Sequence, residues 1–188
     1  MVIYRVHVSL IGIEPPIWRS IELSSQTTLK QFHRILQIVM GWENYHLHEF
    51  ILNGQRYGIP DPNYDEPGEV IAEGLVRLAE VLPAPGASIV YVYDLGDYWE
   101  HAVRLESAMP AQPDAEYPRV VGGARRCPPE DCGGSSGYAN LMEILMDPTH
   151  EEYSAMREWA GDDFYAEEFP TTRITKRLRR NRSLAIKA

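Results

Sequence analysis

Uncharged segments long enough to cross a membrane are missing from this sequence. The longest stretch without Asp, Glu, Lys or Arg runs over 13 residues from Val81 to Tyr93 and contains two prolines. A membrane-spanning helix needs roughly 20 apolar residues, so we expect no transmembrane segment. Arg5 and Glu14 interrupt the apolar residues near the N-terminus, so a signal peptide is not expected either. These features predict a cytoplasmic protein without a membrane partner.

Cysteine is scarce, with Cys127 and Cys132 as the only two. A reducing compartment disfavours a structural disulfide between them, which leaves a free pair or metal ligands. Thiolates and imidazoles are the ligands that tetrahedral Zn²⁺ prefers. His101 is the candidate third ligand, because alternation along residues 99–105 turns it toward the apolar face. A buried imidazole needs a partner, which can be a metal, a carboxylate such as Asp94 or a backbone group.

The sequence therefore offers a zinc site on Cys127, Cys132 and His101 as one hypothesis. His46 and His48, two residues apart on an expected strand, would share a face and could add a fourth ligand. The alternative is that Cys127 packs as a small apolar side chain and that His101 is held by hydrogen bonds.

Basic side chains are scarce outside the C-terminus. The formal net charge is −9, but residues 171–188 carry seven cations and no acid, so residues 1–170 carry −16. An acidic body repels phosphate backbones, so any contact with nucleic acid is expected from the basic tail. The alternative is a solvated helix whose cations complement the protein's own acidic surface. The tail residues considered are Arg173, Lys176, Arg177, Arg179 and Arg180.

The overall composition is that of an ordinary globular protein, 44% hydrophobic and 24% charged over 188 residues. A chain of this length can bury roughly 70% of its unfolded surface, so it needs neither a metal nor a disulfide to fold. We therefore predict a single domain over residues 1–188. It comprises a sheet with a helix (1–107), a loop rich in Pro, Gly and Cys (108–137), and C-terminal helices with the basic tail (138–188).

Hydrophobic periodicity predicts the elements of the first part. Thr28 and Gln31 have the spacing of a helix capping box, an apolar stripe follows at helical spacing, and Gly41 lies where such a helix ends. The resulting order ββαβββ predicts an α+β fold, in which a mixed sheet packs on one helix in a β-grasp-like arrangement. Alternation indicates strands at about 4–11, 17–23, 46–52, 88–94 and 99–106.

Proline and glycine predict the irregular segments. Residues 58–70 are expected to form an exposed loop. Residues 108–137 contain five prolines and five glycines, which favours a long loop over a strand or helix. A helix is predicted to start at Asp147, as N-cap before a proline, and to end at Gly161. The last helix is expected to start near Thr172 and to carry the basic tail.

Four motifs occur along the chain and carry a family resemblance. They are Pro15-Pro16-Ile17-Trp18-Arg19, the segment from Met40 to Phe50, the segment from Tyr93 to His101, and the segment from Cys127 to Gly134. Together they resemble the plasmid pRiA4b ORF-3-like family over nearly the whole chain. The resemblance implies a bacterial or archaeal protein with an α+β fold and no established biochemical activity. It also implies relatives labelled as insertion-element passenger proteins with a resolvase-like name.

A resolvase activity does not fit the residues. Strand exchange needs a Ser or Tyr nucleophile inside a cluster of arginines that neutralises the scissile phosphate. Arginines are densest in the tail, where five of the 15 lie within residues 171–188, while the body is strongly negative. We therefore expect no recombinase activity.

Polar and aromatic residues in the four motifs are expected to form a common surface. Aromatic side chains beside a loop can line a binding groove, and carboxylates can bind hard metals or serve acid–base chemistry. The alternatives are that the aromatic residues belong to the core and that Asp94 and Asp97 hold a turn. The candidate binding residues are Trp18, Trp42, His46, His48, Asp94, Asp97, Trp99, His101, Glu130 and Asp131.

These observations predict a binding or accessory module without enzymatic activity, related to mobile-element and plasmid-encoded proteins. Its partner is expected to be a protein or a small ligand. One alternative is a zinc-binding protein or metal-dependent hydrolase that uses Cys127, Cys132 and His101, with Glu130 as a base. The other alternative is a nucleic-acid accessory protein that acts through the tail.

Overall fold

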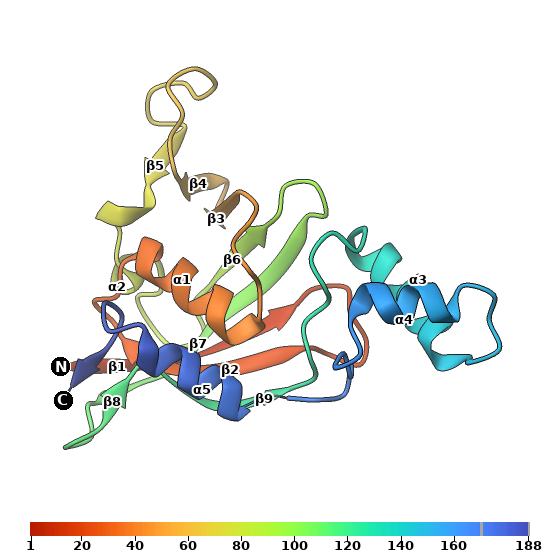
Figure 1. The fold of residues 1–188 in the computed structure, drawn as a ribbon. Helices are drawn as coiled ribbons and strands as arrows, with labels where there is room; N and C mark the ends of the chain where they lie inside the picture. Colours follow the sequence, from red (N-terminus) through yellow and green to blue (C-terminus); the bar gives the residue numbers. More distant parts are fainter. Residues whose placement is uncertain (170, 188) are drawn as a thin grey trace.

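The alternating apolar residues form strands of one large sheet (Figure 1). The computed structural model describes residues 1–169 and 171–187. The strands of this sheet are β1 (Val2–Leu10), β2 (Trp18–Ser24), β3 (His48–Leu52), β4 (Gln55–Gly58), β5 (Val70–Ala72), β6 (Ser88–Tyr93), β7 (Trp99–Pro110) and β9 (Arg119–Ala124). They pair in the order β5-β4-β3-β6-β7-β1-β2-β9. The pair β4–β5 is parallel and the other pairs are antiparallel, so the sheet is mixed, as predicted.

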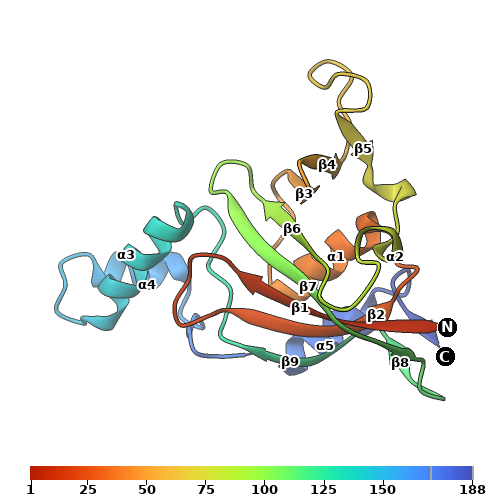
Figure 2. The ribbon, with the colours of Figure 1, turned by 180° about the vertical axis from the view of Figure 1, so that it is seen from behind.

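The helix α1 (Leu29–Met40) begins and ends where the sequence predicts. Thr28 Oγ1 accepts a hydrogen bond from the Gln31 backbone N–H, and the Gln31 side chain accepts one from the Thr28 N–H, which completes the capping box. Gly41 ends the helix at a φ of 108°, in the left-handed region that favours glycine. The apolar stripe of α1 is buried in the core, and Figures 1 and 2 show the helix on one face of the sheet. The α+β class is therefore confirmed.

The structure corrects the prediction that residues 108–137 form a loop. β7 extends to Pro110, and β9 pairs with β2 at the edge of the sheet. Two glycines of β9 do not fit the apolar alternation of a strand, because aromatic rings occupy the space that larger side chains would need. A Cβ on Gly122 would lie 3.3 Å from the Trp18 ring, and one on Gly123 would lie 2.4 Å from Phe169. A short second sheet joins β8 (Glu116–Tyr117) to β10 (Ile186–Lys187).

The predicted loop at 58–70 is confirmed in its middle, since β4 ends at Gly58 and β5 begins at Val70. This segment projects from the body of the fold (Figure 1). The 3-10 helix η1 (Glu73–Leu75) and the short α2 (Leu78–Val81) follow β5 and lead back to the sheet at β6.

Three helices complete the chain. α3 (Gly134–Met146) and α4 (Tyr153–Ala160) project together beyond one end of the sheet, whereas α5 (Thr171–Arg180) packs against α1 and β9 (Figures 1 and 2). α4 ends before Gly161 as predicted, but its N-cap is Glu152, five residues after the expected N-cap, Asp147. The Asp147 carboxylate instead accepts hydrogen bonds from the N–H and hydroxyl of Thr149, which closes a turn after α3. In the described part of the chain, no helix combines the length and apolar character needed to cross a bilayer.

Candidate metal centre

Three chain segments meet at one end of the sheet because of the register of β3 and β6. His48 on β3 is paired with Tyr93 on β6, so the residues just before β3 and just after β6 are neighbours. The Asp94 N–H donates to the Leu47 carbonyl at 2.9 Å and fixes this junction. His46 and Asp94 therefore face each other, and the segment between β9 and α3 brings a second pair of acids beside them.

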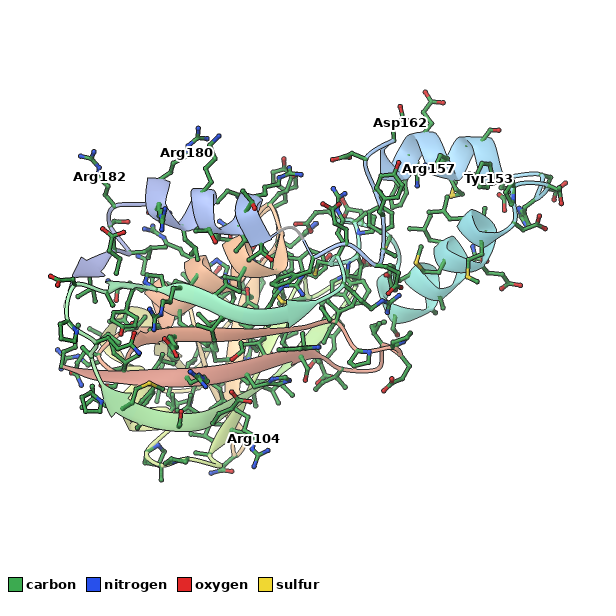
Figure 3. The ribbon with its side chains drawn as sticks, turned by 90° about the horizontal axis from the view of Figure 1, so that it is seen from below. Arg104, Tyr153, Arg157, Asp162, Arg180 and Arg182 are labelled. Carbon is green, nitrogen blue, oxygen red and sulfur yellow. The ribbon has the colours of Figure 1, made fainter. Side chains whose placement is uncertain are left out.

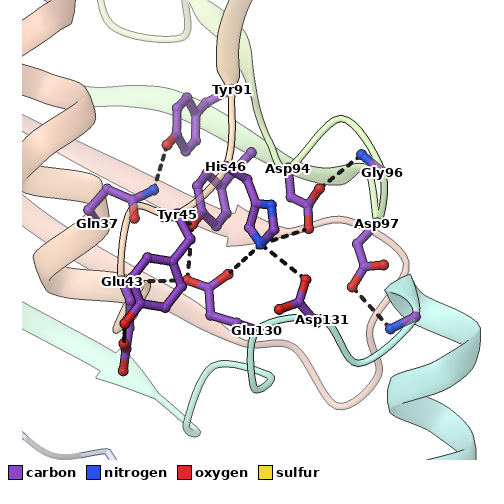
Figure 4. Close-up of polar contacts among 12 residues, drawn as sticks. Gln37, Glu43, Tyr45, His46, Tyr91, Asp94, Gly96, Asp97, Glu130 and Asp131 are labelled. Carbon is purple, nitrogen blue, oxygen red and sulfur yellow. Dashed lines mark hydrogen bonds and ion pairs between the residues drawn. The ribbon is translucent and has the colours of Figure 1, made fainter.

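His46 lies among three carboxylates (Figure 4). Its Nε2 atom is 3.1 Å from Asp131 Oδ1, 3.6 Å from Asp94 Oδ2 and 3.8 Å from Glu130 Oε2. Nε2 of His46 and Oε2 of Glu130 are both buried, and neither has a hydrogen-bond partner among the described residues. Metal bonds of about 2.0–2.2 Å place neighbouring ligand atoms roughly 3–3.5 Å apart. The four atoms thus have about the spacing of ligands around one cation.

The carboxylates are oriented by a second set of hydrogen bonds. Glu130 Oε1 accepts the Glu43 backbone N–H at 2.6 Å and the Tyr93 hydroxyl at 3.0 Å. Asp94 Oδ1 accepts the N–H of Gly96 at 2.9 Å. Each of these carboxylates therefore has one oxygen held in place and the other directed at His46, as is typical of metal ligands with supporting partners. Burial raises the pKa of Glu130.

The backbone at this centre adopts conformations that L-residues rarely take. Asp94 and Asp131 have φ values of 59° and 56°, in the left-handed region. Tyr98, in the turn after β6, has a φ of 56°, and Asn44, two residues before His46, has a φ of 62°. Aspartate and asparagine tolerate this region better than tyrosine does. Such outliers cluster at functional sites, where the surrounding structure maintains the strain.

One side of the centre is buried in the protein, and the other side is open to solvent. The Asp94 and Glu130 side chains are only 8% and 14% exposed, whereas the Asp131 side chain is 69% exposed. An ion held here would have buried ligands on one side and access to water on the other. In the described part of the chain, His46, Asp94 and Asp131 form the one group of three or more His, Cys, Asp or Glu residues whose ligand atoms all lie within 4.8 Å.

The structure does not bring Cys127, Cys132 and His101 together as a ligand set. Both cysteines are free thiols, with Cys127 buried and Cys132 half-buried. His101 is fully buried, as predicted, and both of its ring nitrogens are engaged. The Trp42 indole N–H donates to its Nε2 at 3.3 Å, and its Nδ1 lies 3.2 Å from the Tyr91 carbonyl, to which it donates. The partner that the sequence requires for His101 is therefore an indole and a backbone group.

His46 and His48 diverge, although the sequence suggests that they share a face. β3 starts only at His48, so strand alternation does not relate the two. The His48 ring stacks on His33 of α1, and its Nε2 lies 2.8 Å from Glu73 Oε2. His48 thus belongs to a buried polar group in the core and not to the candidate metal centre.

The remaining candidate residues fall into two groups. Asp97 accepts the Gly133 N–H at 3.0 Å and links the turn after β6 to the start of α3. Trp42 and Trp99 are buried with ring centroids 5.8 Å apart, as the core alternative predicts. Trp18 stacks on His7 on the sheet. Of the residues that orient the centre, the sequence did not single out Glu43, whose contribution is a backbone N–H and has no side-chain signature.

The basic residues of α5 lie on two faces. Arg173 and Arg177 line a cavity beside the candidate metal centre. Lys176, Arg179 and Arg180 lie along the other side of the helix with its threonines. Figure 3 shows Arg180 and Arg182 pointing away from the sheet.

Comparisons with known proteins cover nearly the whole chain. The model of the family described as plasmid pRiA4b ORF-3-like protein matches residues 2–173. The chain is 36% identical over 163 residues to the uncharacterized protein y4hQ of Sinorhizobium fredii (strain NBRC 101917 / NGR234), with 87% of this chain and 83% of that protein covered. It is also similar to the crystal structure of MM3350, a protein of unknown function from Methanosarcina mazei Go1. The TM-score is 0.83 at 35% identity, covering 91% of this chain and 96% of that one. The resemblance carried by the four motifs is thus confirmed, and the chain belongs to the plasmid pRiA4b ORF-3-like protein family.

Proposed function

We propose that the protein is a binding module that holds one divalent metal ion on His46, Asp94 and Asp131, with Glu130 as a further ligand. One observation carries this proposal. The buried Nε2 of His46 faces three carboxylate oxygens at 3.1–3.8 Å and makes no hydrogen bond within the described residues. An imidazole that needed only a hydrogen-bond partner would align with one carboxylate. The His46 imidazole instead lies between three carboxylates, which is the arrangement expected of a metal ligand.

The donor set favours a first-row transition ion. Imidazole suits Zn²⁺ and Fe²⁺, and carboxylates extend the range to Mn²⁺. Ca²⁺ takes six to eight oxygen ligands, and a centre with a nitrogen and three carboxylates suits it less well. We therefore expect Zn²⁺ or Mn²⁺ to bind more tightly than Ca²⁺ or Mg²⁺.

Calorimetric titration of the full chain tests this proposal. Protein treated with chelator and then dialysed is titrated with ZnCl₂ and, separately, with MnCl₂. We expect one ion per chain, bound at least tenfold more weakly by Asp131→Asn and His46→Gln. Because the Asp131 side chain is 69% exposed, Asp131→Asn should fold normally.

Two control variants make this titration specific. Asp162→Asn removes an exposed carboxylate outside the centre and should leave the affinity unchanged. Cys132→Ser tests the alternative zinc site and should also leave it unchanged. If Cys132→Ser loses metal binding and Asp131→Asn retains it, the binding site is at the cysteines and not at His46. Absence of binding in the unmodified chain would refute the metal proposal.

A metal-dependent hydrolase is the second candidate function, supported by one observation. Glu130 belongs to the centre and also lines the adjacent cavity, whose lining includes four arginines. A metal ion there could polarise a bound ester and activate water. Release of p-nitrophenol from p-nitrophenyl phosphate by the metal-loaded chain, abolished by Asp131→Asn, would support this function. Release that survives the substitution would refute it.

Nucleic-acid contact through α5 is supported only by its outer face. Ile174 and Leu178 are buried, so deletion of the tail would disturb the fold as well as the charge. The double substitution Arg179→Gln with Arg180→Gln removes exposed charge alone. Retention of a DNA fragment at low salt should fall in this variant if the outer face binds nucleic acid, and unchanged retention would reject that role.

A further inference from the structure

A cavity of about 350 Å³ lies beside the candidate metal centre. Its walls come from the end of α1, the segment from Cys127 to Glu130, the end of α4 and the start of α5. This volume is at the lower end of the range for small-molecule sites, about 300–1,000 Å³. The cavity is therefore of a size for a small organic ligand.

Positive charge is concentrated in this cavity, although the protein is acidic. Four arginines line it, against two acids, in a chain with a net charge of −9. Arg126 and Arg173 approach the Asp163 carboxylate at 3.4 and 3.7 Å. Arg19 and Arg177 have no carboxylate within 4 Å among residues 1–169 and 171–187. These two guanidinium groups provide the unbalanced charge of the cavity.

Arg19 is held rigidly and is almost completely buried, with 1% exposure. Its Nε donates to the Val39 carbonyl at 2.7 Å, and its Nη1 donates to the carbonyls of Trp18 and Ala124 at 2.8 Å each. The ring of Phe169 lies 4.8 Å from its guanidinium carbon. The carbonyl groups and the aromatic ring carry no negative charge, so the Arg19 guanidinium has no counter-ion among these contacts. A buried charge of this kind is costly unless an anion balances it.

Aromatic side chains form the apolar part of the cavity. Trp42 and Phe164 are buried, whereas Trp159 at the end of α4 is 48% exposed. An exposed indole beside a charged cavity can stack on the planar or apolar body of a ligand. The cavity thus has a cationic part and an aromatic part.

We propose that this cavity binds a small phosphomonoester, with its phosphate between Arg19 and Arg177 and its body against Trp159. Arginine suits phosphate because its planar guanidinium donates several hydrogen bonds to phosphate oxygens. In Arg19 only Nη2 remains for a ligand, because Nε and Nη1 donate to backbone carbonyls. Two arginines on separate elements, β2 and α5, match a dianion that accepts from several directions. This inference does not rest on the metal proposal, because neither arginine belongs to the candidate metal centre.

Binding of phenyl phosphate to the full chain tests the inference. Tryptophan fluorescence is followed during titration in the presence of chelator, so that no metal contributes. We expect saturable quenching, with at least tenfold weaker binding in Arg177→Gln. The matched control is Arg180→Gln, which removes the same charge from the same helix but on the outward side (Figure 3), and should change the affinity less than twofold. Arg19→Gln is avoided because Arg19 also joins α1 to β2 and β9.

Two further probes identify the recognised group. Phenol keeps the ring and lacks the anion, and benzoate replaces the phosphate by a carboxylate. Binding of phenyl phosphate at least tenfold tighter than both supports the proposal. Equal binding of benzoate would overturn the phosphate assignment, and equal weakening in the two arginine variants would show general attraction of anions only. Absence of saturable quenching, confirmed by calorimetry, would refute the site. Phenyl phosphate binding by a chain that binds no metal would contradict the metal proposal alone.

Discussion

The imidazole rings of His33 and His48 stack with centroids 3.4 Å apart and an interplanar angle of 5°. This contact joins α1 to β3 within the core. His33 lies 2.8 Å from the Tyr91 hydroxyl and 2.7 Å from Asn44 Oδ1. In the neutral ring, Nε2 donates to Oδ1 of Asn44 and Nδ1 accepts the proton of the tyrosine hydroxyl. Burial, followed by the nearby His48, lowers the pKa of His33 to about 4.

Stability should fall in mild acid because two buried histidines remain neutral. Burial lowers the pKa of His33 and of His101 to about 4, whereas an unfolded histidine has a pKa of about 6.5. Below pH 6.5 the unfolded chain binds protons that the folded chain does not. The free energy of unfolding therefore decreases as pH falls from about 6.5 to 4, by on the order of 3 kcal/mol for each histidine.

Urea unfolding at pH 7.0, 5.5 and 4.5 measures this dependence. His33→Gln removes one of the two titrating groups and should show a shallower decrease. His150→Gln, in the turn before α4, should follow the unmodified chain. An equal free energy of unfolding at pH 7.0 and 4.5 would contradict the prediction.

Glu22 should tolerate neutralisation better than the loss of its partners. Its side chain is 1% exposed and lies 2.6 Å from each of Arg5 and Arg119, which are 43% and 36% exposed. Burial alone would raise the pKa of Glu22, but the hydrogen bonds to the two arginines outweigh burial and lower it. Arg5→Ala with Arg119→Ala leaves a buried carboxylate without a cation and should cost roughly 3–5 kcal/mol. Glu22→Gln leaves two arginines that can turn to water and should cost about 1–2 kcal/mol. Chemical unfolding of both variants would show the reverse order if this account is incorrect.

Gly137 should not accept a side chain. A Cβ at this position would lie 1.8 Å from the Cys132 carbonyl oxygen, a backbone atom that cannot move without the whole segment before α3. We expect Gly137→Ala to destabilise the protein by more than 2 kcal/mol, or to prevent folding, as overpacking does. Gly74→Ala is the matched control, because its nearest contact would be the flexible end of Lys30 at 3.8 Å. Similar melting temperatures for the two variants would show that the segment adjusts freely.

Tyr93→Phe should weaken metal binding and lower the free energy of unfolding by about 1–2 kcal/mol, because the partners of a buried hydroxyl are left unpaired. The substitution removes the hydroxyl that donates to Glu130 Oε1 and accepts from the Tyr45 N–H. Loss of such a supporting hydrogen bond lowers metal affinity by about 10–100-fold. Tyr45→Phe is the control, since its exposed hydroxyl donates to Glu43 and not to the centre. Calorimetry with the ion that binds the unmodified chain would give equal affinities for both variants if the hydroxyl has no orienting role.

Local patterns predicted the elements whose structure is determined locally. The capping box at Thr28 and the glycine at Gly41 are signals within a few residues of the helix ends, and α1 follows them. The start of α4 was mispredicted by the same logic, because Asp147 can cap a helix or close a turn. Only the chain direction after α3 decides between the two. The sequence does not predict β9, because its glycines make room for the rings of Trp18 and Phe169, which are distant in sequence.

The candidate metal centre was predicted in its members but not in its grouping. The sequence indicates His46, Asp94, Glu130 and Asp131 as surface candidates, whereas its zinc hypothesis groups Cys127, Cys132 and His101, with His46 or His48 as the fourth ligand. Cysteine spacing is a visible local signal, whereas the convergence of His46 and Asp94 depends on the register of β3 against β6. Register between strands 40 residues apart has no local signature.

The two edge strands of the sheet, β5 and β9, differ in what they offer to a neighbouring molecule. β5 has only three residues, so it offers little template for strand addition. β9 is longer, but α5 packs against it, and Figure 3 shows the helix on the side away from β2. Exposed strand edges are the usual starting point of edge-to-edge aggregation. α5 therefore covers this edge of the sheet, and we expect that loosening the helix would expose β9 to pairing with a strand of another molecule.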